Sequence, residues 1–223
     1  MEILFDTANL TAIEEMTPYY PVSGVTTNPT ILKAEGRIDF YDHFHRIREL
    51  IGADRTLHIQ VLAQDWEGIV ADAHRLIDQV DAGVYAKIPT TEQGIRAMRV
   101  LKEEGIGVTA TAIYSKTQGM LAIAAGADYI APYFNRMESL DIDTSATIKS
   151  LAKFIDRHGA SCKIMAASFK NVAQVSAAFE AGAAAVTLHP DLLRAALAAP
   201  DVTQAVLAFA DDWYETYGTT HLP

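Results

Sequence analysis

Residues 107–132 read GVTATAIYSKTQGMLAIAAGADYIAP, and they contain the pattern that decides the fold. The segment Gly107–Ile113 is short, apolar and rich in β-branched residues, which is typical of a strand. A helical stretch, Ser115–Ala125, follows it, and a Gly-Ala pair then leads into a second apolar segment, Tyr129–Pro132. Neither segment alternates strictly between apolar and polar residues, which suits parallel strands covered on both faces. The stretch therefore predicts a strand–helix–strand unit with parallel strands.

The same unit recurs along the whole chain. The predicted strands are Ile3–Phe5, Val22–Thr26, Leu57–Leu62, Val84–Ile88, Gly107–Ile113, Tyr129–Pro132, Lys163–Ala167 and Ala184–Leu188. The predicted helices are Asn9–Met16, Phe40–Ile51, Gln64–Gln79, Thr91–Glu104, Ser115–Ala125, Thr144–His158, Asn171–Ala181, Asp191–Ala198 and an extra C-terminal helix over Thr203–Tyr217. Eight strand–helix units in about 200 residues predict an α/β fold, a (β/α)8 TIM barrel that forms one domain over residues 1–223. A doubly wound open sheet is disfavoured, because Asp6-Thr7-Ala8-Asn9 follows the first strand where such sheets carry a glycine-rich turn.

Composition narrows the possible partners of the 223-residue chain. Half of the residues are hydrophobic and 21% are charged, so the chain is not largely disordered. The formal charge of −10 disfavours binding to nucleic acid and membrane surfaces, and an anionic substrate needs a local cationic pocket.

The single cysteine, Cys162, cannot form an intrachain disulfide, and no Cys/His cluster has the spacing of a metal site. With no signal peptide or long apolar run evident, we expect a cytoplasmic protein.

Polar residues end several of the predicted strands. In a barrel of this kind the active site forms at the C-terminal ends of the strands, so these side chains are expected to converge. They are Asp6, Thr26, Thr27, Asn28, Gln60, Lys87, Thr111, Tyr133, Arg136, Ser168 and His189.

Lys87 is the most informative of them because it interrupts the apolar strand Val84–Ile88. Burial lowers the pKa of a lysine, and a neutral amine is a nucleophile toward carbonyl groups. The alternative is a lysine that reaches out of the barrel mouth or pairs with a carboxylate. Lys163 begins its strand instead of ending it, so it is expected to extend into solvent at the other end of the barrel.

Other strand-end residues are candidates for proton transfer. Asp6 suits a proton carrier beside the lysine, or alternatively an N-cap for the helix near Asn9. Tyr133 suits a general acid or base acting through a water that Gln60 and Thr111 orient; the alternative for all of them is packing in the barrel.

Arg136 and Ser168 suit an anion. The arginine directly follows the sixth strand, and the serine ends the seventh strand ahead of a helix N-terminus. A surface arginine is the alternative. The pair predicts that a phosphorylated substrate binds at the barrel mouth.

The histidines do not form a cluster in the sequence. His43 and His45 are expected on an exposed helix, and His58 is expected inside the barrel with its hydrogen bonds satisfied. His74, His158 and His221 are expected in solvent, and His189 has no assigned role.

Several motifs resemble the transaldolase family over the whole chain. They are Phe5-Asp6-Thr7-Ala8, Gly24-Val25-Thr26-Thr27-Asn28-Pro29-Thr30, Ala86-Lys87-Ile88-Pro89-Thr90-Thr91-Glu92-Gln93-Gly94, Ala131-Pro132-Tyr133-Phe134-Asn135-Arg136 and Ala166-Ala167-Ser168-Phe169-Lys170. The length matches the small subfamily that holds short transaldolases and fructose-6-phosphate aldolases.

This resemblance implies a class I mechanism with no metal or other cofactor. Lys87 would form a Schiff base with a ketose, and Asp6 would move protons during its formation. Thr26, Thr27 and Asn28 would lie at the substrate hydroxyls. Arg136 and Ser168 would bind the phosphate of a sugar-phosphate substrate.

Two positions distinguish the members of the family. Transaldolases generally carry a glutamate where this chain has Gln60 and a phenylalanine where it has Tyr133, so the sequence is closer to fructose-6-phosphate aldolase. A transaldolase that transfers a dihydroxyacetone unit remains the alternative, and a non-catalytic sugar-phosphate binder is a third hypothesis. Residues 137–143 lack the glycine that related aldolases usually have, and His189 stands where relatives often have proline.

The resemblance also implies a homo-oligomer, a decamer in this subfamily. The helix at Thr203–Tyr217 would pack on a neighbouring subunit through Phe209, Trp213, Tyr214 and Tyr217. Alternatively, these aromatic residues cap their own barrel.

Overall fold

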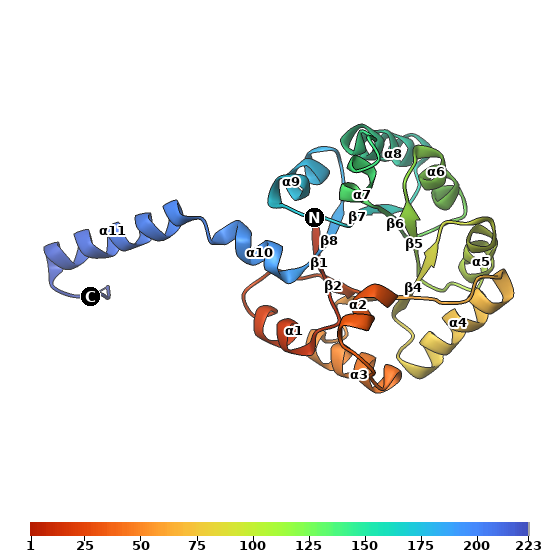
Figure 1. The fold of residues 1–223 in the computed structure, drawn as a ribbon, viewed down its shortest axis with the longest axis horizontal. Helices are drawn as coiled ribbons and strands as arrows, with labels where there is room; N and C mark the ends of the chain where they lie inside the picture. The colour runs from red at the N-terminus through yellow and green to blue at the C-terminus, as the bar shows by residue number, and fades with distance from the viewer. Residues whose placement is uncertain (223) are drawn as a thin grey trace.

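A computed structural model describes residues 1–222 as a closed barrel of eight parallel strands that pair in chain order (Figure 1). The strands are β1 (Glu2–Asp6), β2 (Gly24–Thr26), β3 (Thr56–Gln60), β4 (Val84–Pro89), β5 (Val108–Ile113), β6 (Tyr129–Pro132), β7 (Lys163–Ala166) and β8 (Ala185–Leu188). Pairing of β1 with β8 closes the barrel. The predicted TIM barrel is confirmed.

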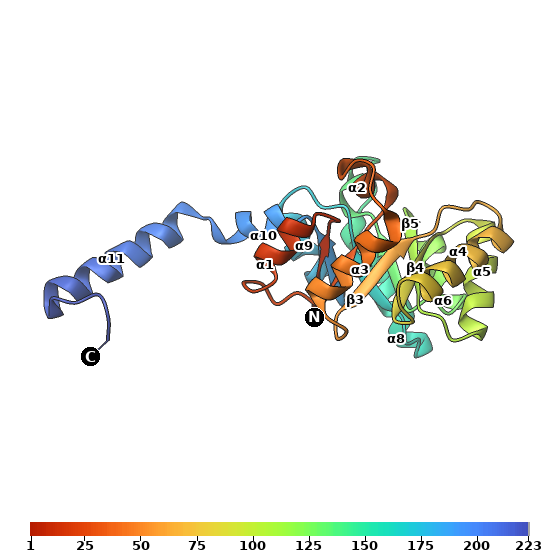
Figure 2. The same cartoon turned by 90° about the horizontal axis from the view of Figure 1, so that it is seen from below.

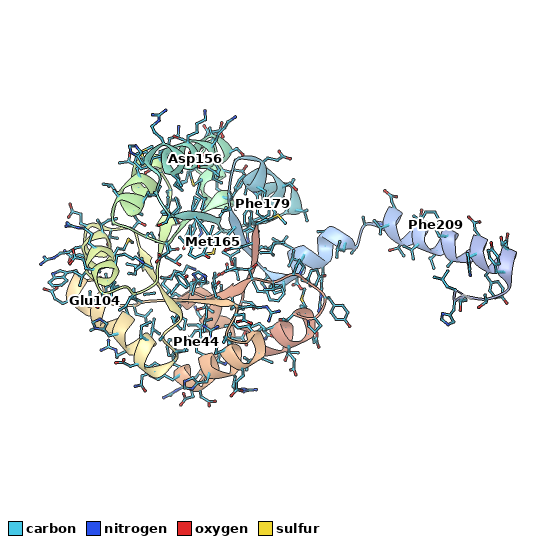
Figure 3. The ribbon with its side chains drawn as sticks, turned by 180° about the vertical axis from the view of Figure 1, so that it is seen from behind. Phe44, Glu104, Asp156, Met165, Phe179 and Phe209 are labelled. Atoms are coloured by element: carbon cyan, nitrogen blue, oxygen red, sulfur yellow. The ribbon has the colours of Figure 1, made fainter. Side chains whose placement is uncertain are left out.

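Ten helices lie around the barrel within residues 1–222, and an eleventh, α11, follows them at the C-terminal end. They are α1 (Leu10–Met16), α2 (Pro29–Ala34), α3 (Phe40–Ile51), α4 (Trp66–Gln79), α5 (Glu92–Glu103), α6 (Lys116–Ala124), α7 (Phe134–Glu138), α8 (Thr144–His158), α9 (Val172–Glu180), α10 (Pro190–Leu197) and α11 (Pro200–Tyr217). The apolar layer between strands and helices forms the main core, with Phe44 of α3 among its largest fully buried side chains (Figure 3). The short helices α2 and α7 were not predicted, because six and five residues are too few to show a helical period.

Side chains that point into the barrel form two layers, two residues apart along each strand. The base layer contains Leu4, His58, Tyr85, Thr109, Tyr129, Met165 and Ala185, with Met165 at the centre of the barrel in Figure 3. Two positions further on, several strands present polar residues toward the mouth: Asp6, Gln60, Lys87, Thr111 and Thr187. Because side chains alternate between the faces of a strand, a step of two residues keeps the same face and moves toward the C-terminal end. The candidate site therefore stands directly on the base layer.

The rings of His58, Tyr85 and Tyr129 pack against one another in the base layer of the barrel. His58 is fully buried, stacks on Tyr85 with ring centroids 4.8 Å apart, and meets the edge of Tyr129 at 5.1 Å. Its Nδ1 lies 2.7 Å from Thr109 Oγ1 and its Nε2 lies 2.9 Å from Thr56 Oγ1, so the expected satisfied barrel histidine is confirmed. Burial lowers the pKa of His58 to about 3, with the Lys87 charge adding to the effect.

His43 does not lie on an exposed face, contrary to the prediction. It is buried between α3 and the loop after β1, and its Nε2 donates to the Ala8 carbonyl at 2.8 Å. A carbonyl only accepts, so this nitrogen carries a proton. His45, on the same helix, is exposed as expected.

The C-terminal helix α11 extends away from the barrel (Figures 1 and 2). Phe209, Tyr214 and Tyr217 are exposed, so they do not cap their own barrel. No single helix within residues 1–222 is long and apolar enough to cross a membrane; α10 and α11 together meet that length and composition, with a bend of 49° between them.

Candidate active site

The candidate site occupies the mouth of the barrel, where the strands end. In the side view, α2 lies at this end and the N-terminus lies at the opposite end (Figure 2). The strand ends bring Asp6, Lys87 and Thr111 to the mouth. Tyr133 directly follows β6, Arg136 lies on α7, and Ser168 lies in the loop after β7.

Lys87 points into the barrel and is only 2% exposed. Its Nζ donates a hydrogen bond to the Thr27 carbonyl at 3.0 Å. Burial lowers its pKa, the negative charge of Asp6 opposes that shift, and the positive charge of Arg136 adds to it. A lysine held in this way has a larger neutral, nucleophilic fraction than a surface lysine. It does not reach out of the barrel mouth.

Lys163 provides the contrast within the same fold. It begins β7, is exposed, and pairs with Glu2 at the base of the barrel. The expected difference between the two strand lysines is therefore present in the structure.

Asp6 is held by a chain of hydroxyl groups. Thr26 Oγ1 lies 2.7 Å from Asp6 Oδ1 and 2.6 Å from Thr187 Oγ1. A hydroxyl has one proton to donate, so while Asp6 is ionised Thr26 donates to the carboxylate and Thr187 donates to Thr26. Asp6 does not cap the next helix; Asn9 does, through its side-chain oxygen.

Thr26 and Thr27 are completely buried, and each forms a hydrogen bond to a charged side chain of the site. Thr26 uses its hydroxyl on Asp6, and Thr27 uses its carbonyl on Lys87. The Thr27 hydroxyl is the one buried side-chain polar atom without a hydrogen-bond partner within residues 1–222. Such an atom at a mouth lined by polar groups is a candidate contact for a bound molecule.

A bulge in β5 places Thr111. The register with β6 shifts between Ala110 and Ile113, and Ala112 adopts a φ of 56° there. Thr111 Oγ1 then lies 3.0 Å from the hydroxyl of Tyr133. Burial raises the pKa of Tyr133, although Thr111 and the charge of Arg136 oppose that shift, so the phenol stays protonated and able to donate at neutral pH.

Gln60 lies on the other side of the lysine. It is aligned with Lys87 across the β3–β4 pair, whereas Thr111 comes from β5. The structure therefore joins Thr111 to Tyr133 directly and places Gln60 one strand from Lys87.

Arg136 is exposed at the mouth on α7. Its guanidinium carbon lies 4.8 Å from the centre of the Tyr133 ring, and its Nη1 donates to the hydroxyl of Tyr114 at 3.2 Å. The arginine is held by neutral aromatic groups, which leaves its charge available to an anion.

Ser168 follows β7 in a strained conformation. Its φ is 65°, in the left-handed region that residues other than glycine rarely adopt. Its carbonyl accepts from Asn135 N at 2.9 Å, next to Arg136, while Phe134 N donates to Ala167 O at 2.7 Å. These bonds join the start of α7 to the segment after β7. Backbone strain of the kind seen at Ser168 tends to occur at functional sites.

Asn28 and His189 both serve as N-caps. The Asn28 side-chain oxygen accepts from Thr30 N and Ile31 N at the start of α2, so its amide NH2 is the group left to meet a substrate hydroxyl. His189 is exposed and accepts from Asp191 N through Nδ1 at the start of α10. It borders a pocket of about 500 Å³ that also reaches Asp6.

Two site residues were missed by reasoning from the sequence. Thr187 is a polar residue inside the apolar strand Ala185–Leu188, and that interruption could have revealed it. Tyr114 directly follows β5, in the same position relative to its strand as Tyr133 to β6. No group of three or more His, Cys, Asp or Glu residues is placed to hold a metal ion in the part of the chain that the structure describes.

Comparison with known proteins identifies the family of the chain. Residues 3–219 match the family model described as transaldolase/fructose-6-phosphate aldolase. A protein of Streptococcus pneumoniae (strain ATCC 700669 / Spain 23F-1), named a probable fructose-6-phosphate aldolase, is 50% identical over 214 residues, which cover 96% of each chain. This chain therefore belongs to the transaldolase/fructose-6-phosphate aldolase family.

Proposed function

We propose that this protein is a class I aldolase that reversibly cleaves fructose 6-phosphate to dihydroxyacetone and glyceraldehyde 3-phosphate. The observation that carries the proposal is Lys87, a 2% exposed lysine inside the barrel mouth with a lowered pKa. Membership of the family and the name of the streptococcal relative support the same activity.

Lys87 is the nucleophile of this mechanism. The neutral Nζ attacks the ketone carbon, and loss of water leaves a protonated imine. A base then removes the proton of the C4 hydroxyl, the C3–C4 bond breaks, and its electron pair moves into the imine, which releases the aldehyde. Protonation of the resulting enamine at C3 and addition of water then release dihydroxyacetone and restore the amine.

Asp6 and Tyr133 divide the proton transfers. The hydroxyl chain from Thr187 through Thr26 orients the Asp6 carboxylate, which suits the proton movements of imine formation. Tyr133 is protonated and linked to Thr111, which suits the donor that quenches the enamine, through a water that Gln60 helps to hold.

Residues around the rim of the mouth would bind the phosphate and the hydroxyl groups of the substrate. Arg136 on α7 and Ser168 in the loop after β7 suit the phosphate, because the hydrogen bond from Asn135 N to Ser168 O joins these two segments. The Thr27 hydroxyl and the amide NH2 of Asn28 are the polar groups that suit the ketose hydroxyls, and Thr26 contributes by holding Asp6 beside them.

Transaldolase activity is the alternative, and the acceptor requirement separates the two. The test measures release of glyceraldehyde 3-phosphate from fructose 6-phosphate with and without erythrose 4-phosphate. We expect release without the acceptor, because the Tyr133–Thr111 pair supplies a proton to the enamine. Release only with the acceptor would identify a transaldolase instead. No release, and no borohydride trapping of dihydroxyacetone on Lys87, would leave only a sugar-phosphate binder.

We also propose a cytoplasmic homo-oligomer, a decamer, in which α11 packs on a neighbouring subunit. The exposed apolar side chains of α11 support this: Val202, Val206, Leu207, Phe209, Tyr214 and Tyr217. Light scattering of the full chain tests it against the variant Phe209→Asp, which should dissociate. A monomeric full chain would contradict it.

A further inference from the structure

We propose that Tyr114 is a positioning residue that orients Arg136 toward the phosphate of the aldehyde substrate, and so sets the preference of the enzyme for phosphorylated aldehydes. The inference rests on the proposed function, because it concerns how that site selects its substrate.

Tyr114 is held in place both through its backbone and through its ring. Its backbone N donates to Gln118 Oε1 at 2.8 Å, which fixes the residue at the start of α6. Its ring meets the edge of the Tyr133 ring, with centroids 5.5 Å apart and planes at 72°. The hydroxyl therefore has a defined position beside the mouth.

The side chain of Arg136 needs contacts with other residues to hold it in one orientation. It is an exposed residue on the five-residue helix α7, and a long side chain in that setting otherwise samples many rotamers. Tyr114 accepts its Nη1 proton at 3.2 Å, while the Tyr133 ring supports the plane of the guanidinium. The two contacts together define both position and tilt.

Neutral partners matter for the chemistry. No carboxylate forms an ion pair with Arg136 in the part of the chain that the structure describes, although Arg48, Arg75 and Arg194 all have one. A carboxylate would orient the arginine but would also neutralise it and compete with phosphate. A phenol orients it and leaves the full charge, with further N–H donors, for an anion.

The experiment compares two aldehydes that differ by the phosphate. Condensation of dihydroxyacetone with glyceraldehyde 3-phosphate and with glyceraldehyde is measured for wild type, Tyr114→Phe, Arg136→Ala and the double variant. Tyr19→Phe, which removes an exposed phenol hydroxyl from the loop after α1, is the matched control. The quantity of interest is the ratio of kcat/KM for the two aldehydes.

We expect Tyr114→Phe to lower that ratio about fivefold, through a higher KM for the phosphorylated aldehyde, with glyceraldehyde kinetics unchanged. Arg136→Ala should lower it further, and the double variant should equal Arg136→Ala, because Tyr114 acts only through the arginine. Tyr19→Phe should equal wild type. The inhibition constant of inorganic phosphate should rise in Tyr114→Phe by the same factor as KM.

An unchanged ratio, an equal loss with both aldehydes, or a further loss in the double variant would each overturn the role of Tyr114. A wild-type protein that condenses dihydroxyacetone with neither aldehyde would refute the proposed function instead. Calorimetric binding of inorganic phosphate does not depend on turnover, so it still decides the question in that case: equal affinity in wild type and Tyr114→Phe overturns the inference.

Discussion

At the base of the barrel, His58 uses both ring nitrogens in hydrogen bonds to threonine hydroxyls and lies against the rings of Tyr85 and Tyr129. The mouth lies two residues further along each strand. There Lys87 donates to the backbone carbonyl of Thr27, and the hydroxyl of that threonine has no hydrogen-bond partner within residues 1–222. The buried polar groups of the base form hydrogen bonds with one another. The mouth, in contrast, contains a buried hydroxyl that is free to form a hydrogen bond with a bound molecule. The difference teaches that burial alone does not mark a functional group; burial with an incomplete set of partners does.

Lys87→Met removes the buried amine that distinguishes the mouth from the base, and it should have the largest effect on turnover of all the variants. Turnover should fall by about 10⁴-fold or more, since methionine cannot form the imine that Lys87 forms in the proposed mechanism. The melting temperature should change little, because relief of the buried amine's desolvation offsets the lost hydrogen bond to the Thr27 carbonyl, and methionine leaves no cavity. The checks are steady-state kinetics, mass spectrometry after borohydride trapping of dihydroxyacetone, and a thermal melt. Trapping that persists at another lysine would contradict the assignment.

Tyr133→Phe should lower kcat for free aldol cleavage by about 10²- to 10⁴-fold while imine formation is retained. The phenol supplies a proton late in the cycle, and its ring, which supports Arg136, is kept in phenylalanine. Turnover assays combined with borohydride trapping separate the two steps. Equal loss of cleavage and trapping would make Tyr133 a packing residue like those of the base.

Acid should destabilise the base layer of the barrel through protonation of His58. The folded pKa of His58 is about 3 against 6.5 when unperturbed, so between these values the unfolded chain binds a proton that the folded chain does not. The free energy of unfolding should therefore fall as the pH is lowered from 6.5 toward about 3, by up to about 1.4 kcal/mol per pH unit from this group. Urea unfolding of wild type and His58→Gln measures the slope.

His74→Gln is the control, because His74 is on the surface beside Glu104. The additional slope should disappear in His58→Gln and persist in His74→Gln. Identical slopes in wild type and His58→Gln would show that the base histidine titrates normally.

Lys163→Met should have the smallest effect. Its exposed ion pair with Glu2 is expected to contribute about 0–1 kcal/mol to stability, and activity should be unchanged. Chemical denaturation and the aldol assay check both. A large loss of activity would remove the contrast between the two strand lysines.

Reasoning from the sequence predicted the barrel and the position of Lys87 because both depend on local pattern. Apolar segments at regular spacing specify the strands, and a lysine within such a segment is visible without a structure. The short helix α2 depends on the Asn28 cap and Pro29 instead of on any period, so periodicity could not find it.

Other features depend on contacts between distant parts of the chain. His43 is buried because the Ala8 carbonyl, 35 positions earlier, lies over it. Thr187 matters because barrel closure brings β8 against β1, and Thr26 reaches it across that seam from β2. Tyr114 gains a role only when α7 places Arg136 beside it.

The two-residue interval between base and mouth has a consequence for how such a protein can change over evolutionary time. Inserting or deleting one residue within a strand would turn its inward side chains outward, so base and mouth would be lost together. Mutation can therefore explore new chemistry only by exchanging the identity of mouth residues at constant strand length, or by altering the loops beyond them. A library built to redirect this enzyme should vary side chains at the mouth and leave the length of each strand fixed.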